Sequence, residues 1–266
     1  MLLDSDTVPM SAPFEAASYL FRSERRVRVL ELLAGEPRTP GELAAETDAS
    51  KKTVRRALRR FEEFGWVRRT GRNYEVTEPG RAVADRAHNL LGTVDAAATL
   101  CPVARWLPDS FDVDVGDLAD VRVTVPETAD TAAPARRMVE VIAEAETVRA
   151  VAFAVAPGAV EATRHSDRAD LVLAPEAVTF VADDPELRPQ FRTMLAAGWG
   201  VRRFDGDLAY NLVVADETVM VGLVDESGAP SGLVESTDED AREWADERFE
   251  HYHDRAEPLD PERFGE

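Results

Sequence analysis

The sequence predicts a protein of two domains with different surfaces. The second domain is of the α/β class, and the chain as a whole is α+β. Its 266 residues are 44% hydrophobic, which is enough to fill two cores of ordinary size. Residues 1–90 hold 16 basic and 14 acidic residues, whereas residues 91–266 hold 15 and 37. Helical patterns and one hairpin fill the first part, while strands alternate with helices in the second. We therefore expect the two domains to have different partners.

The composition excludes several classes of protein. No run of about 18 apolar residues exists that could span a membrane. The first residues lack the basic flank and apolar core of a secretory signal. The single cysteine, Cys101, rules out an internal disulfide and a cysteine-rich metal site. These observations predict a cytoplasmic protein.

The charge is strongly acidic. The formal net charge is −20, and Lys51 and Lys52 are the only lysines. Such a composition resembles that of proteins from salt-accumulating halophilic archaea. At molar salt the Debye length falls to about 3 Å, so an acidic surface barely repels itself there, whereas dilute buffer would weaken the fold.

Two helices are expected first. One covers residues 23–35, opens at the capping residue Ser23 and repeats apolar residues at helical spacing: Val27, Leu30 and Leu33. The other is short and covers residues 39–47, where Thr39 and Glu42 form a capping box.

The third helix opens at Ser50 and is amphipathic in charge. On a helical wheel its apolar face holds Val54, Ala57, Leu58 and Phe61. The opposite face is basic and holds Lys51, Lys52, Arg55, Arg56, Arg59 and Arg60. A run of charge on a helix is often only a solvated face, and Arg59 with Glu63 could form an ordinary i,i+4 pair.

A hairpin follows this helix and indicates that its basic face is more than a solvated surface. Gly65 ends the helix, and residues 66–69 and 74–77 form two strands around the turn-rich "TGRN". Three helices and a hairpin make a winged helix-turn-helix over residues 13–76, in which the third helix enters the major groove of double-stranded DNA. We predict DNA contacts from the third helix and the wing: Ser50, Lys51, Lys52, Thr53, Arg55, Arg56, Arg59, Arg60, Arg69 and Arg72.

A long helix from Thr77 opens the connecting segment, residues 77–109. Its apolar stripe comprises Val83, Ala87, Leu90, Leu91 and Val94. Such a stripe favours pairing of two subunits, so we expect a homodimer. The alternative is a helix that packs only within its own chain.

Strands and helices then alternate over residues 110–257, which predicts an α/β domain with a mixed sheet. We expect strands at 121–125, 148–155, 170–174, 177–182, 200–204, 210–215, 218–225 and 231–236. We expect helices at 133–146, 157–166, 184–198 and 236–256, the third capped by Asp184 and the last by a Ser236–Glu239 capping box.

This domain offers little chemistry. It has no glycine-rich phosphate loop, and His251 and His253 are two apart on a helix, so they do not share a face. We expect no metal and no cofactor. The candidate ligand contacts are Asn211, which interrupts an apolar strand and could equally be structural, and the neighbouring Arg164 and His165.

Two stretches resemble a known family. "LLAGEPRTPGELAAETDASKKTVRRALRRFEEFGWVRR" is common to many winged-helix regulators, and "ADLVLAPEAV", "YNLVVADETVMVGLVDESG" and "STDEDAREWADERFEHYHDRAE" are more specific. Together they cover residues 20–256 and resemble archaeal winged-helix transcription regulators of the methanogenesis-regulator (filR-like) type. The resemblance implies a transcription regulator whose second domain is a sensor or dimerisation module, with an effector of unknown identity.

The second domain also faintly resembles the phospholipase D fold. The catalytic pattern of that fold, His-x-Lys-x4-Asp, would end at Asp216, but its His and Lys positions are Ala209 and Asn211. We therefore predict that the protein is not an enzyme. Two alternatives remain: an α/β enzyme with a DNA-binding appendage, and a DNA-binding architectural protein without a ligand.

Overall fold

The computed structural model describes residues 12–108, 111–113, 115, 118, 120–208, 210–225 and 229–260. The chain divides into two compact units, of which the first ends at Leu91 and the second begins at Gly92. Among the described residues, no helix has both the length and the hydrophobicity needed to cross a lipid bilayer.

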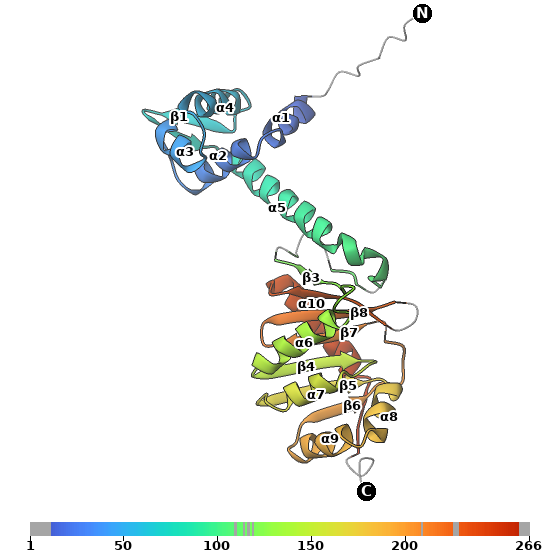
Figure 1. Cartoon of the computed structure of the whole chain (residues 1–266). Helices are drawn as coiled ribbons and strands as arrows, with labels where there is room; N and C mark the ends of the chain where they lie inside the picture. The colour runs from blue at the N-terminus through green and yellow to red at the C-terminus, as the bar shows by residue number, and fades with distance from the viewer. Residues whose placement is uncertain are drawn as a thin grey trace, which may run out of the picture. The chain divides into compact units, whose positions relative to one another are not determined.

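Unit 1 contains the predicted three helices, hairpin and long helix (Figure 1), and one helix that was not predicted. Its elements are α1 (Ala12–Phe21), α2 (Glu24–Gly35), α3 (Pro40–Glu46), α4 (Lys51–Glu63), β1 (Val67–Thr70), β2 (Asn73–Val76) and the first part of α5 (Glu78–Leu100). Strands β1 and β2 pair antiparallel around the Gly71–Arg72 turn. The helix that was not predicted is α1: its apolar residues do not share one face, since Leu20 is buried whereas Phe14 and Phe21 are exposed.

The helix ends of unit 1 follow from local hydrogen bonds. Thr39 and Glu42 form the predicted capping box: the Glu42 N–H donates to Thr39 Oγ1 at 3.3 Å, and the Thr39 N–H donates to Glu42 Oε2 at 2.7 Å. The bonds from the Thr39 backbone and hydroxyl lower the pKa of Glu42. Ser23 stands at the predicted N-cap of α2, but its side chain makes no capping hydrogen bond.

An aromatic cluster fixes α4 within unit 1. Phe61 is fully buried, and its ring lies 6.2 Å from Tyr19 and 5.7 Å from Trp66. Phe64 completes the cluster against Trp66. Because these rings come from α1, α4 and the start of the hairpin, burying one face of α4 orients its opposite face outward.

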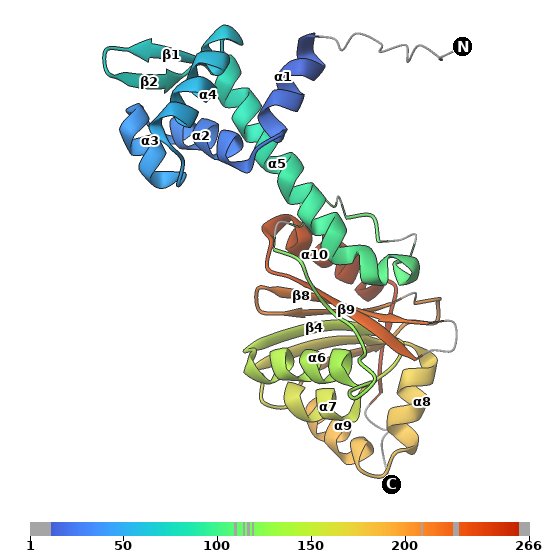
Figure 2. The same cartoon turned by 45° about the horizontal axis from the view of Figure 1, so that its top comes forward.

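Unit 2 is built on an eight-stranded mixed sheet in the order β10-β6-β5-β4-β7-β8-β9-β3. Figure 2 shows its strands β4, β8 and β9. Strands β4, β5 and β6 are parallel, and every other pairing is antiparallel. The strands are β3 (Arg122–Thr124), β4 (Thr147–Ala152), β5 (Arg168–Leu173), β6 (Gly200–Arg203), β7 (Asn211–Ala215), β8 (Thr218–Val224), β9 (Pro230–Ser236) and β10 (Glu257–Pro258). The predicted mixed sheet is confirmed.

Helices cover both faces of this sheet. One face packs against α6, α7, α8 and α9, and the other against α10, the end of α5 and the 3-10 helix η1. Their bounds are η1 (Cys101–Trp106), α6 (Ala133–Glu144), α7 (Pro157–Thr163), α8 (Pro175–Asp183), α9 (Leu187–Ala196) and α10 (Glu239–His253).

The structure corrects three local predictions in unit 2. Residues 177–182 lie in helix α8 rather than a strand, because Pro175 starts a helix whose Ala177, Val178 and Val181 share a buried face. The next helix, α9, begins at Leu187; Asp184 still accepts hydrogen bonds from the Glu186 and Leu187 N–H groups.

The third correction concerns the cap of α10. Its N-cap is Asp238, which accepts a hydrogen bond from the Asp240 N–H, so the predicted Ser236–Glu239 capping box is wrong. Ser236 instead accepts from the Asp238 N–H and donates to Asp120. The hydroxyl thus serves the turn that leads into the helix.

Candidate nucleic-acid interface

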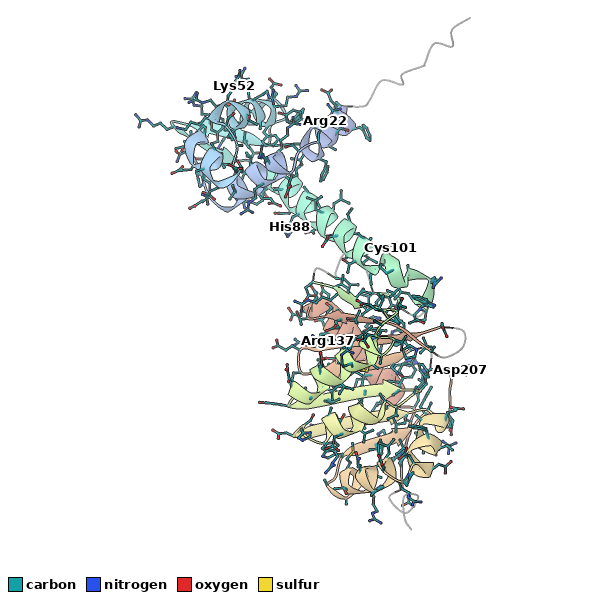
Figure 3. All side chains as sticks on the ribbon, viewed as in Figure 1. Arg22, Lys52, His88, Cys101, Arg137 and Asp207 are labelled. Atoms are coloured by element: carbon teal, nitrogen blue, oxygen red, sulfur yellow. The ribbon has the colours of Figure 1, made fainter. Side chains whose placement is uncertain are left out.

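The exposed side of α4 carries basic side chains directly opposite its buried face. The buried face consists of Val54, Ala57, Leu58 and Phe61, none of which is more than 4% exposed. We call the exposed set the cationic strip: Lys51, Lys52, Arg55, Arg56 and Arg59. Figure 3 shows Lys52 on the outer surface of unit 1. The helical wheel drawn from the sequence is therefore reproduced in the folded domain.

No side chain of the cationic strip has an ion-pair or hydrogen-bond partner among the residues that the structure describes. Other arginines of unit 1 behave differently, since Arg28 pairs with Glu31 and Arg68 with Glu75. A run of unpaired cations in a chain of net charge −20 is available to bind an external polyanion.

Arg60 differs from the cationic strip, although the sequence places it on the same face. Its guanidinium contacts Glu15 of α1 and Glu63, the latter at 2.6 Å, and lies 4.5 Å from the centre of the Phe64 ring. The hydrogen bond to Glu63 raises the pKa of Arg60. Arg60 thus ties α1 to α4, and the prediction that it contacts DNA stays untested.

The remaining predicted contacts lie at the start of α4 and in the wing. Ser50 Oγ accepts a hydrogen bond from the Thr53 N–H at 3.1 Å and lies 2.9 Å from Thr53 Oγ1, so both hydroxyls belong to the cap. In the wing, Arg69 Nε donates to the Gly71 carbonyl at 3.1 Å. Arg72 is exposed at the tip and has no partner in the described part of the chain.

One exposed arginine escaped the sequence analysis. Arg22 directly follows α1 (Figure 3) and has no ion pair within the described residues. It carries no periodic signal, because α1 itself has no apolar stripe.

The predicted ligand contacts of unit 2 do not gather at one place. Asn211 accepts a hydrogen bond from the Phe153 N–H at 3.0 Å and donates to the Ala154 carbonyl at 3.2 Å, so it holds the end of β4. Arg164 pairs with Glu161 at 2.9 Å, and His165 Nδ1 lies 3.0 Å from the Glu161 carbonyl. Both are exposed, and their binding of a ligand stays a prediction.

The position that corresponds to the catalytic aspartate of phospholipase D is structural here. Asp216 accepts hydrogen bonds from the Thr147 N–H at 2.8 Å and the Glu146 N–H at 3.1 Å. Desolvation opposes its ionisation, but these bonds outweigh that effect and lower its pKa. Ala209, at the histidine position of the pattern, lies outside the described residues.

One group of possible metal ligands occurs at the end of α10, where atoms of Glu250, His253 and Asp254 lie within 4.8 Å of one another. Glu250 and Asp254 are exposed, and exposed acidic groups of this kind are common without an ion. The group therefore gives no reason to propose a metal site.

A winged helix-turn-helix whose third helix exposes a run of basic side chains is the arrangement of a DNA-binding transcription regulator. Residues 14–99 match the HVO_A0261 N-terminal domain, and residues 131–255 match the middle domain of the methanogenesis regulatory protein FilR1. The two matches lie one after the other along the chain and bear out its resemblance to the methanogenesis-regulator (FilR1-like) type of regulator. No match was found among curated proteins.

Several solved structures are similar to parts of the chain. The archaeal chromatin protein TrmBL2 is 16% identical, with 92% of this chain and 98% of that chain covered and a TM-score of 0.42. A MarR family protein from Mycobacterium tuberculosis is 27% identical over 34% of this chain and 70% of its own, with a TM-score of 0.31. NucT from Helicobacter pylori is 10% identical over 53% and 99%, with a TM-score of 0.38.

Proposed function

We propose that the cationic strip of α4 enters the major groove of operator DNA while the wing holds the backbone through Arg69 and Arg72. Lys51 and Lys52, in the first turn, lie nearest the phosphates, and Arg55, Arg56 and Arg59 reach the base edges. The observation that carries this proposal is that the cationic strip is exposed, with no ion-pair partner in the part of the chain that the structure describes, while the chain as a whole is acidic.

Salt limits how such a helix can bind. Each phosphate contact contributes about −0.9 to the slope of log affinity against log salt, so at molar salt most of the gain from counterion release is lost. Short-range contacts must then carry more of the affinity, chiefly arginine forks on guanine edges. Strong screening also keeps the field of the acidic unit local, so it does not cancel the strip.

The direct test is to map the bound sites across the genome of the native host and to measure binding to the mapped operator and to a scrambled duplex over a salt series. The proposal requires a specific site whose affinity exceeds that of the scrambled duplex. Equal affinity for both at every salt concentration would instead favour an architectural DNA-binding protein.

Replacing Arg72 with alanine is expected to weaken binding to all sequences by a similar factor, because the wing tip contacts phosphate rather than bases. The slope of log affinity against log salt should become shallower by about one unit. The same salt series on both duplexes measures this. A loss confined to the operator would show that Arg72 reads bases.

We further propose that the protein is a homodimer that uses α5. Val83 and Ala87 pack within unit 1, but Leu90, Leu91 and Val94 are 50%, 43% and 56% exposed. They follow one another at helical spacing, and a C2 dimer would bury them against their own copies. A dimer also presents two reading helices to the two half-sites of an operator.

Sedimentation in molar potassium chloride is expected to give a dimer at tens of micromolar, and the double variant Leu90→Glu/Leu91→Glu is expected to give a monomer. Phe180→Glu is the matched control, because Phe180 is equally exposed, at 46%, on α8 of unit 2. A wild-type monomer, or a control that dissociates as the double variant does, would refute the role of α5.

For unit 2 we propose a regulatory rather than a catalytic role. The position of the phospholipase D lysine is Asn211, whose side chain is bound to the end of β4, and Asp216 is bound to Thr147 and Glu146. The side chains of these two residues thus support the sheet.

A further inference from the structure

Unit 2 contains a cavity of about 340 Å³ between its sheet and the helices α6, α7 and α9. All of its lining residues belong to unit 2, so the cavity does not depend on the position of unit 1. This volume lies at the lower end of the range of small-molecule sites, which is about 300–1,000 Å³. None of the described lining residues belongs to the DNA interface.

Small side chains keep this space open. Strand β4 contributes Ala150 and Ala152, β8 contributes Gly222, and Ala135 and Ala159 lie opposite them on α6 and α7. Protein cores are normally close-packed, and a void loses the dispersion contacts that larger side chains would make. Phe191, Met194 and Leu171 also line the cavity, so its walls are apolar.

The described residues that line the cavity offer no charge to a ligand. Among them there is no acidic or basic side chain, and the polar side chains are Thr163 and Asn211. Thr163 Oγ1 donates to the Ala159 carbonyl at 2.7 Å. Asn211 donates one N–H to Ala154, which leaves its second N–H to meet one acceptor. A charged ligand would be desolvated there without a partner, at high cost.

We propose that this cavity binds an uncharged, mainly hydrocarbon small molecule that carries at most one hydrogen-bond acceptor, held by Asn211. Carboxylates, phosphates and free sugars do not fit, because one Asn211 N–H among the described lining residues cannot replace their hydration. The ion pair between Arg137 of α6 (Figure 3) and the buried Glu235 of β9, at 2.9 Å, anchors α6 to the sheet beside the site.

The sheet lies between this cavity and the end of α5. Gly232 and Leu233 of β9 both line the cavity, and a Cβ added to Gly232 would lie 2.6 Å from Val103 Cγ1. Val103 is in η1, which directly follows α5. The ligand is therefore one strand away from the end of α5. Its role as an effector rests on the proposed function, whereas its binding does not.

The test is a fluorescence titration of the full chain in molar potassium chloride with N-phenyl-1-naphthylamine, an uncharged dye that brightens in apolar surroundings. We expect saturable binding to one site per chain. Dodecan-1-ol should displace the dye at least about tenfold more effectively than dodecanoate, since the two differ in charge but not in chain length. The absence of saturable binding, or equal displacement by both competitors, would overturn the proposal.

Variants locate the bound dye. Ala159→Leu on α7 and Ala152→Leu on β4 should each weaken dye binding at least about tenfold by filling the space, with the unfolding midpoint unchanged or raised. Ala182→Leu is the control, because Ala182 is equally half-buried on the neighbouring α8 but does not line the cavity. If both filled variants bind dye as the wild type does, the site is elsewhere.

Operator binding separates this proposal from the proposed function. Without dye, the filled variants should bind the operator as the wild type does, because none of the altered residues lies in unit 1. Loss of dye binding with operator binding intact is the pattern that supports the site. If the wild type binds dye but no operator, the proposed function fails and the cavity stands.

Discussion

Simultaneous replacement of Arg55 and Arg56 with alanine is expected to reduce the preference for the operator strongly. Each bidentate contact of an arginine with guanine contributes roughly 1–3 kcal/mol of discrimination, so the double variant should lose roughly 2–6 kcal/mol. Both side chains are exposed and have no partner within the described residues, so the domain should fold unchanged. Titration of the operator and of a scrambled duplex with the purified full chain measures the loss.

A matched control removes the same charge from the same unit. Arg28 on α2 and Arg86 on α5 are also exposed, and neither belongs to the cationic strip. The Arg28→Ala/Arg86→Ala variant should bind the operator close to the wild-type level. If the Arg55/Arg56 variant binds the operator as tightly as this control, α4 does not contact the bases of the operator and the central proposal is wrong.

Gly80→Ala is expected to give the largest loss of stability in unit 1. Gly80 is buried in the first turn of α5, and an added Cβ would lie 1.9 Å from the Trp66 carbonyl oxygen and 2.7 Å from its carbon. These are backbone atoms, so the helix and the base of the wing must separate. The cost should reach or exceed about 3 kcal/mol, the upper end for overpacking. Denaturant unfolding followed by circular dichroism measures it.

The same helix supplies the control. Gly92 is also within α5, but nothing lies within 4 Å of its added Cβ. Gly92→Ala should therefore stabilise the protein by roughly 0.5–1 kcal/mol, as alanine does in an open helix. Equal effects of the two substitutions would show that propensity, rather than the contact with Trp66, determines the result.

Helix α4 could be predicted from the sequence because the residue pattern that defines it is local. The periodicity of thirteen residues, Lys51–Glu63, sets the buried face and the basic face of α4 together. Helix α8 was predicted as a strand for the opposite reason: Val178, Thr179 and Val181 favour strands, whereas the start at Pro175 and the packing of Val178 and Val181 against the sheet favour the helix. In α8, tertiary packing outweighs the local strand propensity of the sequence.

The partners of individual side chains and the cavity had no sequence signal. Arg60 follows the same pattern as Arg59, but Glu15, which is 45 residues away, engages only Arg60. The cavity is lined by residues of several helices and strands. The sequence does not show whether an alanine in a strand packs against another side chain or borders a cavity. Asn211 was noticed because it interrupts an apolar strand, although its hydrogen bonds to Phe153 and Ala154 could not be foreseen.

Thr77 ties the start of α5 to the segment that follows α4 with two hydrogen bonds, and it caps the first turn of α5 with a third. Its N–H donates to the Trp66 carbonyl at 2.9 Å, its hydroxyl donates to the Gly65 carbonyl at 2.6 Å, and the same hydroxyl accepts from the Gly80 N–H at 3.2 Å. The first turn of α5 therefore cannot swivel against α4. A displacement that arrives along α5 moves the reading helix and wing as one rigid body. Regulation by this route would alter the spacing or phase of two readers along the double helix and leave the shape of each reader unchanged.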